Sequence, residues 1–189
     1  MSMSIILGYD PTTLREKVDP VAAARRLDEL GEQRSLAAIT ERAALFRLVG
    51  RLEEAWDVSN EALRQARFAG ERTQITRARI RRAVVQQYQG HLEGAMRELS
   101  DCVDEARTHG WSSVEAYALQ HRGRVHFDQR NYKAALEDFR TSLTLRKSVS
   151  SSTEQLEAAQ IAIAVTESFV FKPKDSSHAR LVASQLSCT

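Results

Sequence analysis

One pattern occurs three times in the chain, at intervals of 40 residues, as Gly50-Arg-Leu52-Glu-Glu-Ala55, Gly90-His-Leu92-Glu-Gly-Ala95 and Arg130-Asn-Tyr132-Lys-Ala-Ala135. Further residues recur at the same interval, among them Arg42/Arg82/Arg122, Ala66/Ala106 and Gly70/Gly110. Self-similarity at a fixed period is typical of repeat architectures, in which each unit buries its apolar face against its neighbours. We infer that the chain contains three tandem units of about 40 residues.

Each unit is predicted to form two antiparallel helices. Apolar residues recur every three or four positions on both sides of Gly50, and Gly50 and Gly70 stand where helices end in a left-handed residue. In the third unit we expect Asn131, a residue that tolerates left-handed geometry or caps a helix, to replace the interior glycine. Asp19-Pro20 marks a helix start, because aspartate caps a helix and proline suits its first position. We predict helices near residues 20–30, 34–49, 52–69, 72–89, 92–109, 112–129, 132–147, 153–170 and 176–187.

The composition is typical of a folded, soluble and helical protein. Of 189 residues, 42% are hydrophobic and 28% charged, and 8 Gly and 3 Pro are too few for the many tight turns of a β-sandwich. The balance of 27 basic and 25 acidic residues does not favour nucleic acid or an anionic membrane as partner. Cys102 and Cys188 cannot form a disulfide framework, and no apolar run approaches the roughly 20 residues that span a bilayer. We expect a cytoplasmic protein with no membrane partner.

The repeated residues resemble the tetratricopeptide repeat family. The matching positions are Ala43–Phe46–Gly50–Leu52–Ala55, Ala83–Gly90–Leu92–Ala95 and Gly123–Tyr132–Ala135–Phe139, and the resemblance covers about residues 32–170. It implies an all-α fold, a right-handed α-α superhelix (a solenoid) of about nine helices with one concave and one convex side. The units exceed the family's usual 34 residues. HEAT and armadillo repeats share the longer period but do not explain the Gly-x-Leu-x-x-Ala turn.

The expected organisation has three parts. Residues 1–18 form an N-terminal extension that we expect to be flexible. Residues 19–170 form the repeat domain, with repeats near 34–70, 72–110 and 112–148 and a final helix at 153–170. Residues 171–189 supply a linker and a C-terminal helix, which either caps the last unit or lies in the groove.

The resemblance implies that the first helix of each unit lines a concave groove. By register, the candidate partner-binding residues are Arg47, Arg77, Tyr88, Tyr117, Gln120, Arg124 and Phe127, and the far end of the groove carries Glu157 and Glu167. Arginine pairs with carboxylates, and aromatic side chains supply rigid apolar contact area. We therefore predict a protein-protein interaction module or scaffold that binds a peptide segment of another protein.

Two alternatives remain at this point. The chain could be a regulatory sensor of a signalling peptide, as in bacterial members of the family, with its output in a separate protein. It could also bind nucleic acid through the arginine-rich helix 72–89, although the acidic residues of the next helix, such as Glu98 and Glu105, are simpler counter-charges. Association of two copies through an unfinished end of the array is a further possibility.

The sequence carries no signature of catalysis. It lacks Gly-x-Ser-x-Gly, a glycine-rich phosphate loop and His-Glu-x-x-His. We predict no enzyme, no cofactor and no metal site, with Cys102 as a small buried residue. We also expect Arg42, Arg82 and Arg122 to serve packing, with their guanidinium groups reaching acidic side chains of the neighbouring helix, because a feature repeated in every unit answers a constraint that is repeated too.

Overall fold

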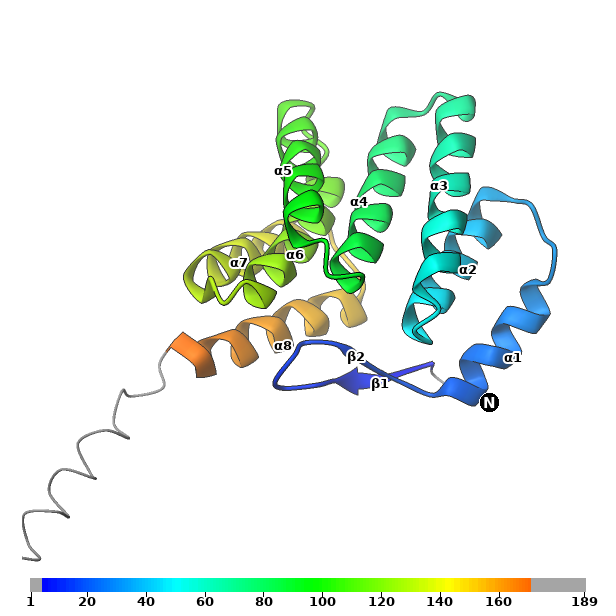
Figure 1. Cartoon of the computed structure of the whole chain (residues 1–189). Coiled ribbons are helices and arrows are strands. Elements are labelled where there is room, and N and C mark those ends of the chain that lie inside the picture. Colours follow the sequence, from blue (N-terminus) through cyan, green and yellow to red (C-terminus); the bar gives the residue numbers. More distant parts are fainter. Residues whose placement is uncertain (1–4, 171–189) are drawn as a thin grey trace, which may run out of the picture.

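The computed structural model describes residues 5–170, and within them it is mainly helical (Figure 1). The helices are α1 (Pro20–Leu30), α2 (Leu36–Leu48), α3 (Leu52–Ala69), α4 (Arg72–Tyr88), α5 (Leu92–Thr108), α6 (Ser112–Asp128), α7 (Tyr132–Ser148) and α8 (Thr153–Val170). A two-stranded antiparallel sheet, β1 (Ile6–Tyr9) and β2 (Glu16–Val18), precedes them. The eight helices predicted within residues 20–170 are confirmed to within two residues at each end. The ninth, 176–187, and the linker before it lie outside the described residues.

From α2 onward each helix packs mainly against the next helix in the chain, as expected for a helical repeat. In addition, α2 contacts α4 and α4 contacts α6. These three helices, the first of each unit, therefore form one layer, which we call the inner layer. The hairpin of β1 and β2 runs from α1 toward α8 (Figure 1). In the part of the chain that the structure describes, no helix is both long enough and apolar enough to cross a membrane.

Small residues at repeated positions allow this close packing. Ala55, Ala95 and Ala135, which end the repeated turn pattern, have no exposed surface. Gly123 departs from the alanine found at the two equivalent positions, and the structure explains why. A Cβ atom at Gly123 would lie 2.7 Å from the ring of Phe139, a fully buried side chain. The large Phe139 of α7 thus requires the smallest residue on α6.

The repeated arginines serve helix packing as predicted in two of the three units. Arg82 of α4 pairs with Glu98 of α5 at 2.6 Å, and Arg122 of α6 pairs with Asp138 of α7 at 2.7 Å. Glu98 and Asp138 are themselves 40 residues apart, and Val58 stands at the equivalent place in the first unit. Because that position carries no carboxylate, Arg42 donates instead to the backbone oxygen of Gly31 at 2.6 Å.

The left-handed residue of the third unit is Arg130 and not Asn131, which instead stands at the N-cap position of α7, where its side chain accepts no capping hydrogen bond. Arg130 has a φ of 60°, close to the 81° of Gly50 and the 83° of Gly90, whereas Asn131 has a φ of −85°. The turn between the two helices of a unit requires this conformation whichever residue occupies the position. A non-glycine residue adopts it at a cost of about 1–2 kcal/mol.

The N-terminal extension, expected to be flexible, is folded over its described residues 5–18. The side chain of Asp10 begins the hairpin loop by accepting hydrogen bonds from the backbone nitrogens of Thr12 (2.9 Å) and Thr13 (2.8 Å). Leu14, in the left-handed region with a φ of 55°, is buried against Phe127 of α6 and Phe139 of α7. The helices therefore supply the apolar surface that this short segment lacks by itself.

Candidate functional site

Three of the predicted groove residues converge on one side chain of the hairpin. Arg47 of α2 and Arg124 of α6 each pair with the carboxylate of Glu16 at 3.2 Å, and the hydroxyl of Tyr88 of α4 donates to the same carboxylate. The Glu16 side chain is only 8% exposed. The inner layer thus holds a carboxylate, as the arginines predicted, but that carboxylate belongs to the chain itself.

The electrostatics of this contact favour the ionised form of Glu16. Burial alone would raise the pKa of Glu16, but the guanidinium groups of Arg47 and Arg124 and the hydrogen bond from Tyr88 outweigh burial and hold the pKa well below its usual range. Burial raises the pKa of Tyr88, which therefore stays a hydrogen-bond donor. A desolvated carboxylate between two arginines fixes the hairpin on the inner layer.

Further contacts hold the hairpin beside Glu16. Arg15 pairs with Asp128 at 2.7 Å, and its guanidinium carbon lies 4.0 Å from the ring centroid of Tyr88. On β1, the ring of Tyr9 lies 5.1 Å from the guanidinium carbon of Arg124. The sequence analysis missed Glu16 and its neighbours. The signal that could have indicated them is the Asp10-Pro-Thr-Thr turn after the apolar stretch 5–9, because such a turn is typical of a hairpin loop.

Two other predicted site residues lie in the core. Phe127 is 4% exposed and packs with Leu14 and Phe139, while its ring meets Tyr132 and Phe169 edge to face. Gln120 is 3% exposed, and its side chain faces Ser142 of α7. Their register on α6 is that of groove residues, but the hairpin and α7 bury them.

The remaining two predicted residues, Arg77 and Tyr117, line an open space of about 210 Å³ between α4, α6, α7 and the start of α8. We call this space the arginine cavity, because two further arginines, Arg81 and Arg146, line it as well. Arg77 donates to the hydroxyl of Ser113. The full lining is Arg77, Arg81, Ser113, Ala116, Tyr117, Arg146, Ser151 and Gln155.

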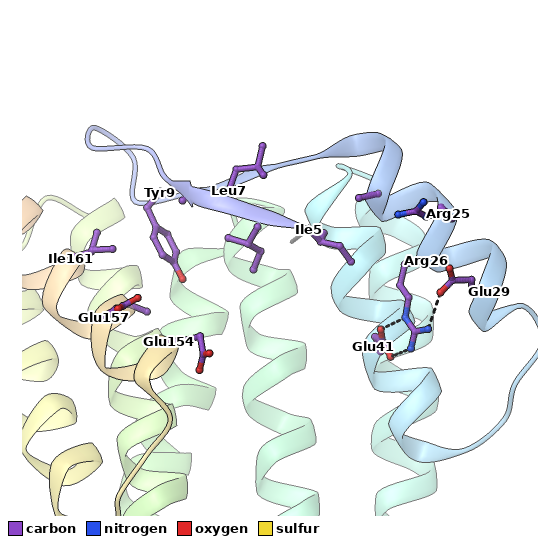
Figure 2. A pocket seen from close by; sticks show the side chains of 14 residues that line it. Ile5, Leu7, Tyr9, Arg25, Arg26, Glu29, Glu41, Glu154, Glu157 and Ile161 are labelled. Carbon is purple, nitrogen blue, oxygen red and sulfur yellow. Dashed lines mark hydrogen bonds and ion pairs between the residues drawn. The ribbon is translucent and has the colours of Figure 1, made fainter. Parts of the chain in front are cut away.

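A larger space of about 1010 Å³ lies between the hairpin, α1, α2 and the first half of α8, and we call it the hairpin cavity (Figure 2). Figure 2 shows the side chain of Tyr9 on the side of the hairpin, Arg26 with two glutamates on one wall, and Glu154, Glu157 and Ile161 on the opposite wall. The lining residues are Ile5, Ile6, Leu7, Gly8, Tyr9, Ala22, Arg25, Arg26, Glu29, Glu41, Glu154, Glu157, Ala158 and Ile161.

The two walls of the hairpin cavity differ in charge. Arg26 is neutralised, because it pairs with Glu41 at 2.5 Å and with Glu29 at 3.0 Å. Across the cavity, Glu154 and Glu157 are exposed, and neither has a cationic partner among residues 5–170. Of these residues the sequence analysis identified only Glu157. The others come from the hairpin and α1, which the groove register does not cover, and from positions of α2 and α8 that the register did not select.

Away from the two cavities, Cys102 is buried and His121 is partly buried, whereas His91 and His109 are exposed. Cys102 has no exposed surface, and burial raises the pKa of its thiol to about 12. Burial and the charge of Arg124 lower the pKa of His121, whose ring packs edge to face on Tyr117 at 4.7 Å. Among the described residues, no group of three or more His, Cys, Asp or Glu side chains is placed to hold a metal ion.

No family model matches the chain, and neither does any curated protein. The basis for inferring function is therefore the geometry of the hairpin and of the two cavities. Of these, the hairpin cavity is the largest space and joins apolar side chains with unpaired charges.

Proposed function

We propose that the chain is a protein-interaction module of the tetratricopeptide type, a right-handed α-α superhelix, and that it binds a segment of a partner protein in the hairpin cavity. One observation carries this proposal: a space of about 1010 Å³ lies between the first and last helices of the described array, with unpaired carboxylates opposite apolar side chains. Its volume is at the upper end of the roughly 300–1,000 Å³ that is usual for ligand sites.

The chemistry of the lining indicates the partner. Ile5 and Leu7 of the hairpin and Ile161 of α8 offer apolar contacts, and Leu7 is 66% exposed. Glu154 and Glu157 would pair with cationic side chains of the bound segment. The segment that fits best therefore carries apolar residues together with Lys or Arg. This differs from the acidic partner that the arginines of the inner layer suggested, because Glu16 already occupies two of those arginines.

Affinity capture from a lysate of the native organism tests this function. The full chain serves as bait, beside the double variant Glu154→Lys/Glu157→Lys, which reverses the charge of one wall. A matched control is Glu93→Lys/Glu137→Lys, which makes the same change in net charge at exposed positions on α5 and α7 outside the cavity. We expect the wild type and the control to recover the same protein and the cavity variant to lose it.

Equal recovery by all three baits would contradict binding in the hairpin cavity. Recovery of a short free peptide in place of a protein, with the same dependence on Glu154 and Glu157, would favour the signalling-peptide sensor over the scaffold.

A further inference from the structure

We propose that the arginine cavity is a binding site for a phosphoryl group. This site is separate from the hairpin cavity, since the two share no lining residue. It lies between α4 and α6 of the inner layer, the end of α7 and the start of α8. Its volume of about 210 Å³ is several times the roughly 30 Å³ that one water molecule occupies in the liquid. The space therefore accommodates a tetrahedral oxyanion and an attached group.

The charge of the cavity is uncompensated. Arg77, Arg81 and Arg146 line it, and none of them has a carboxylate within 4.0 Å among the residues that the structure describes. The outer side of the same helix α4 is different. There Arg82 pairs with Glu98 at 2.6 Å and Arg79 pairs with Glu105 at 3.0 Å. The positive charge of α4 is thus neutralised toward α5 and left available toward the cavity.

Within residues 5–170, the lack of a carboxylate partner is most unfavourable for Arg146, because its guanidinium group is buried. Its side chain is buried, with 6% of the residue exposed, and its hydrogen-bond partners are neutral: the hydroxyl of Ser142 at 3.2 Å and the backbone oxygen of Gln155 at 3.0 Å. Burial lowers the pKa of Arg146, and the nearby charge of Arg124 acts in the same direction. Holding a cation out of water without a counter-ion is energetically unfavourable. A bound anion would remove that cost, which is a physical reason for the site to take one.

The donors of the cavity match a phosphoryl group better than a carboxylate. Each guanidinium presents five N–H donors in a planar fork, and Ser113, Ser151 and Tyr117 add hydroxyl groups. A carboxylate offers two oxygens and one negative charge. A phosphoryl group offers three or more oxygens and up to two charges, so it can pair with more than one guanidinium group.

Titration calorimetry of the full chain with inorganic phosphate tests the proposal, with sodium chloride at equal ionic strength as the reference. We expect saturable binding by the wild type. For Arg81→Gln we expect the affinity for phosphate to fall by about tenfold or more, because one charged hydrogen-bonding partner is lost. Arg77→Gln serves as a second variant should Arg81→Gln melt differently from the wild type. The matched control is Arg79→Gln, the same change on the outer side of α4, which should bind like the wild type.

Heat that does not exceed that of the chloride reference, or equal binding by the wild type and both cavity variants, would overturn the proposal. Two further probes separate the possible sources of the group. A phosphoserine tripeptide that binds more tightly than free phosphate, with no binding by its serine counterpart, would identify a phosphorylated side chain. Equal binding of the phosphoserine tripeptide and free phosphate would identify a small phosphate compound. These outcomes do not depend on the hairpin cavity, so this proposal and the proposed function can fail separately.

Discussion

The inner layer carries arginines in two different situations. At one end, Arg47 and Arg124 enclose the carboxylate of Glu16 at 3.2 Å each. Farther along, Arg77 and Arg81 of α4 line a cavity and have no carboxylate partner within residues 5–170. The residue type is the same and the helices belong to the same layer. The difference is that a distant segment of the chain returns over the first pair and leaves the second pair open.

We call the part of the inner layer around Arg47 and Arg124 the closed end, and the part around the arginine cavity the open end. The difference between them implies that the closed end contributes to stability and the open end to binding. A buried arginine with a counter-ion fixes structure, whereas one without a counter-ion raises the free energy of the unliganded fold. Four predictions test this division, from the largest expected effect to the smallest.

Glu16→Gln should produce the largest loss. The substitution keeps the size of the side chain and removes its charge, so that Arg47 and Arg124 are left buried without a counter-ion. We expect the free energy of unfolding to fall by about 3–5 kcal/mol, the usual cost of removing one partner of a buried ion pair. Chemical denaturation measures this directly. Limited trypsin digestion should in addition cut faster after Arg15 and Lys17 if the hairpin is released.

The control for this experiment is Glu32→Gln, at an exposed glutamate in the loop before α2. It removes the same charge and should change stability by no more than about 0.5 kcal/mol. An equal effect of the two substitutions would show that Glu16 does not hold the hairpin.

Leu14→Ala should be the next largest effect. Leu14 is 3% exposed and fills the space between Phe127 and Phe139, and truncating it leaves a cavity at the closed end. We expect a loss of about 2–4 kcal/mol, in the range measured for buried leucines. Hydrogen exchange can locate the loss, because protection should fall first in β1 and β2. An unchanged hairpin and an unchanged melting temperature would contradict this account of the closed end.

Acid should reduce the effect of Glu16→Gln. Because the pKa of Glu16 in the folded chain lies below its value in the unfolded chain, Glu16 contributes its full stabilisation above the unfolded value of about 4.3. The contribution is lost as the pH falls below that value toward the folded pKa. We therefore expect the stability difference between wild type and variant to be constant from pH 5 to 7 and to shrink at lower pH. A stability difference between wild type and variant that stays unchanged down to pH 2 would argue against an ionised, stabilising Glu16.

Arg81→Gln should have the smallest effect, and it tests the open end. Among residues 5–170 Arg81 has no carboxylate partner to lose, and removing its charge relieves repulsion from Arg77 and Arg146 across the cavity. We expect a change within about 0.5 kcal/mol, with a slight gain at low ionic strength. Thermal melting at two salt concentrations measures it. A loss comparable to that of Glu16→Gln would mean that Arg81 also has a structural role.

Local patterns predict the helices of this chain well, because the causes of helix formation act within a few residues. The side chain of Asp19 accepts from the backbone nitrogens of Val21 (2.9 Å) and Ala22 (3.0 Å), as expected from the Asp-Pro pair. The pairing of Arg82 with Glu98 also follows from the repeat, since it joins helices that are neighbours in the chain. The left-handed conformation of Arg130 was harder to predict. Residue preference favoured Asn131, but the repeat geometry requires this conformation at the position equivalent to Gly50 and Gly90.

The candidate site was predicted only in part, for a reason of distance along the chain. Register placed Arg47, Tyr88 and Arg124 on one face, and the structure brings these three together. Register could not reveal that Glu16, which is 108 residues before Arg124, occupies that face. It also could not reveal that the first helix and the start of α8 enclose a common space with the hairpin.

Periodicity, caps and small residues act within a few positions of the chain, so the amino-acid sequence is enough to predict the helices, their order and the repeated contacts between neighbours. Which arginines are neutralised, which residues are buried and where open space remains follow from the three-dimensional arrangement. Those outcomes depend on the return of residues 5–18 across the inner layer. That arrangement is stabilised by burying Leu14 and by pairing Glu16 with helices that lie far from it in the sequence.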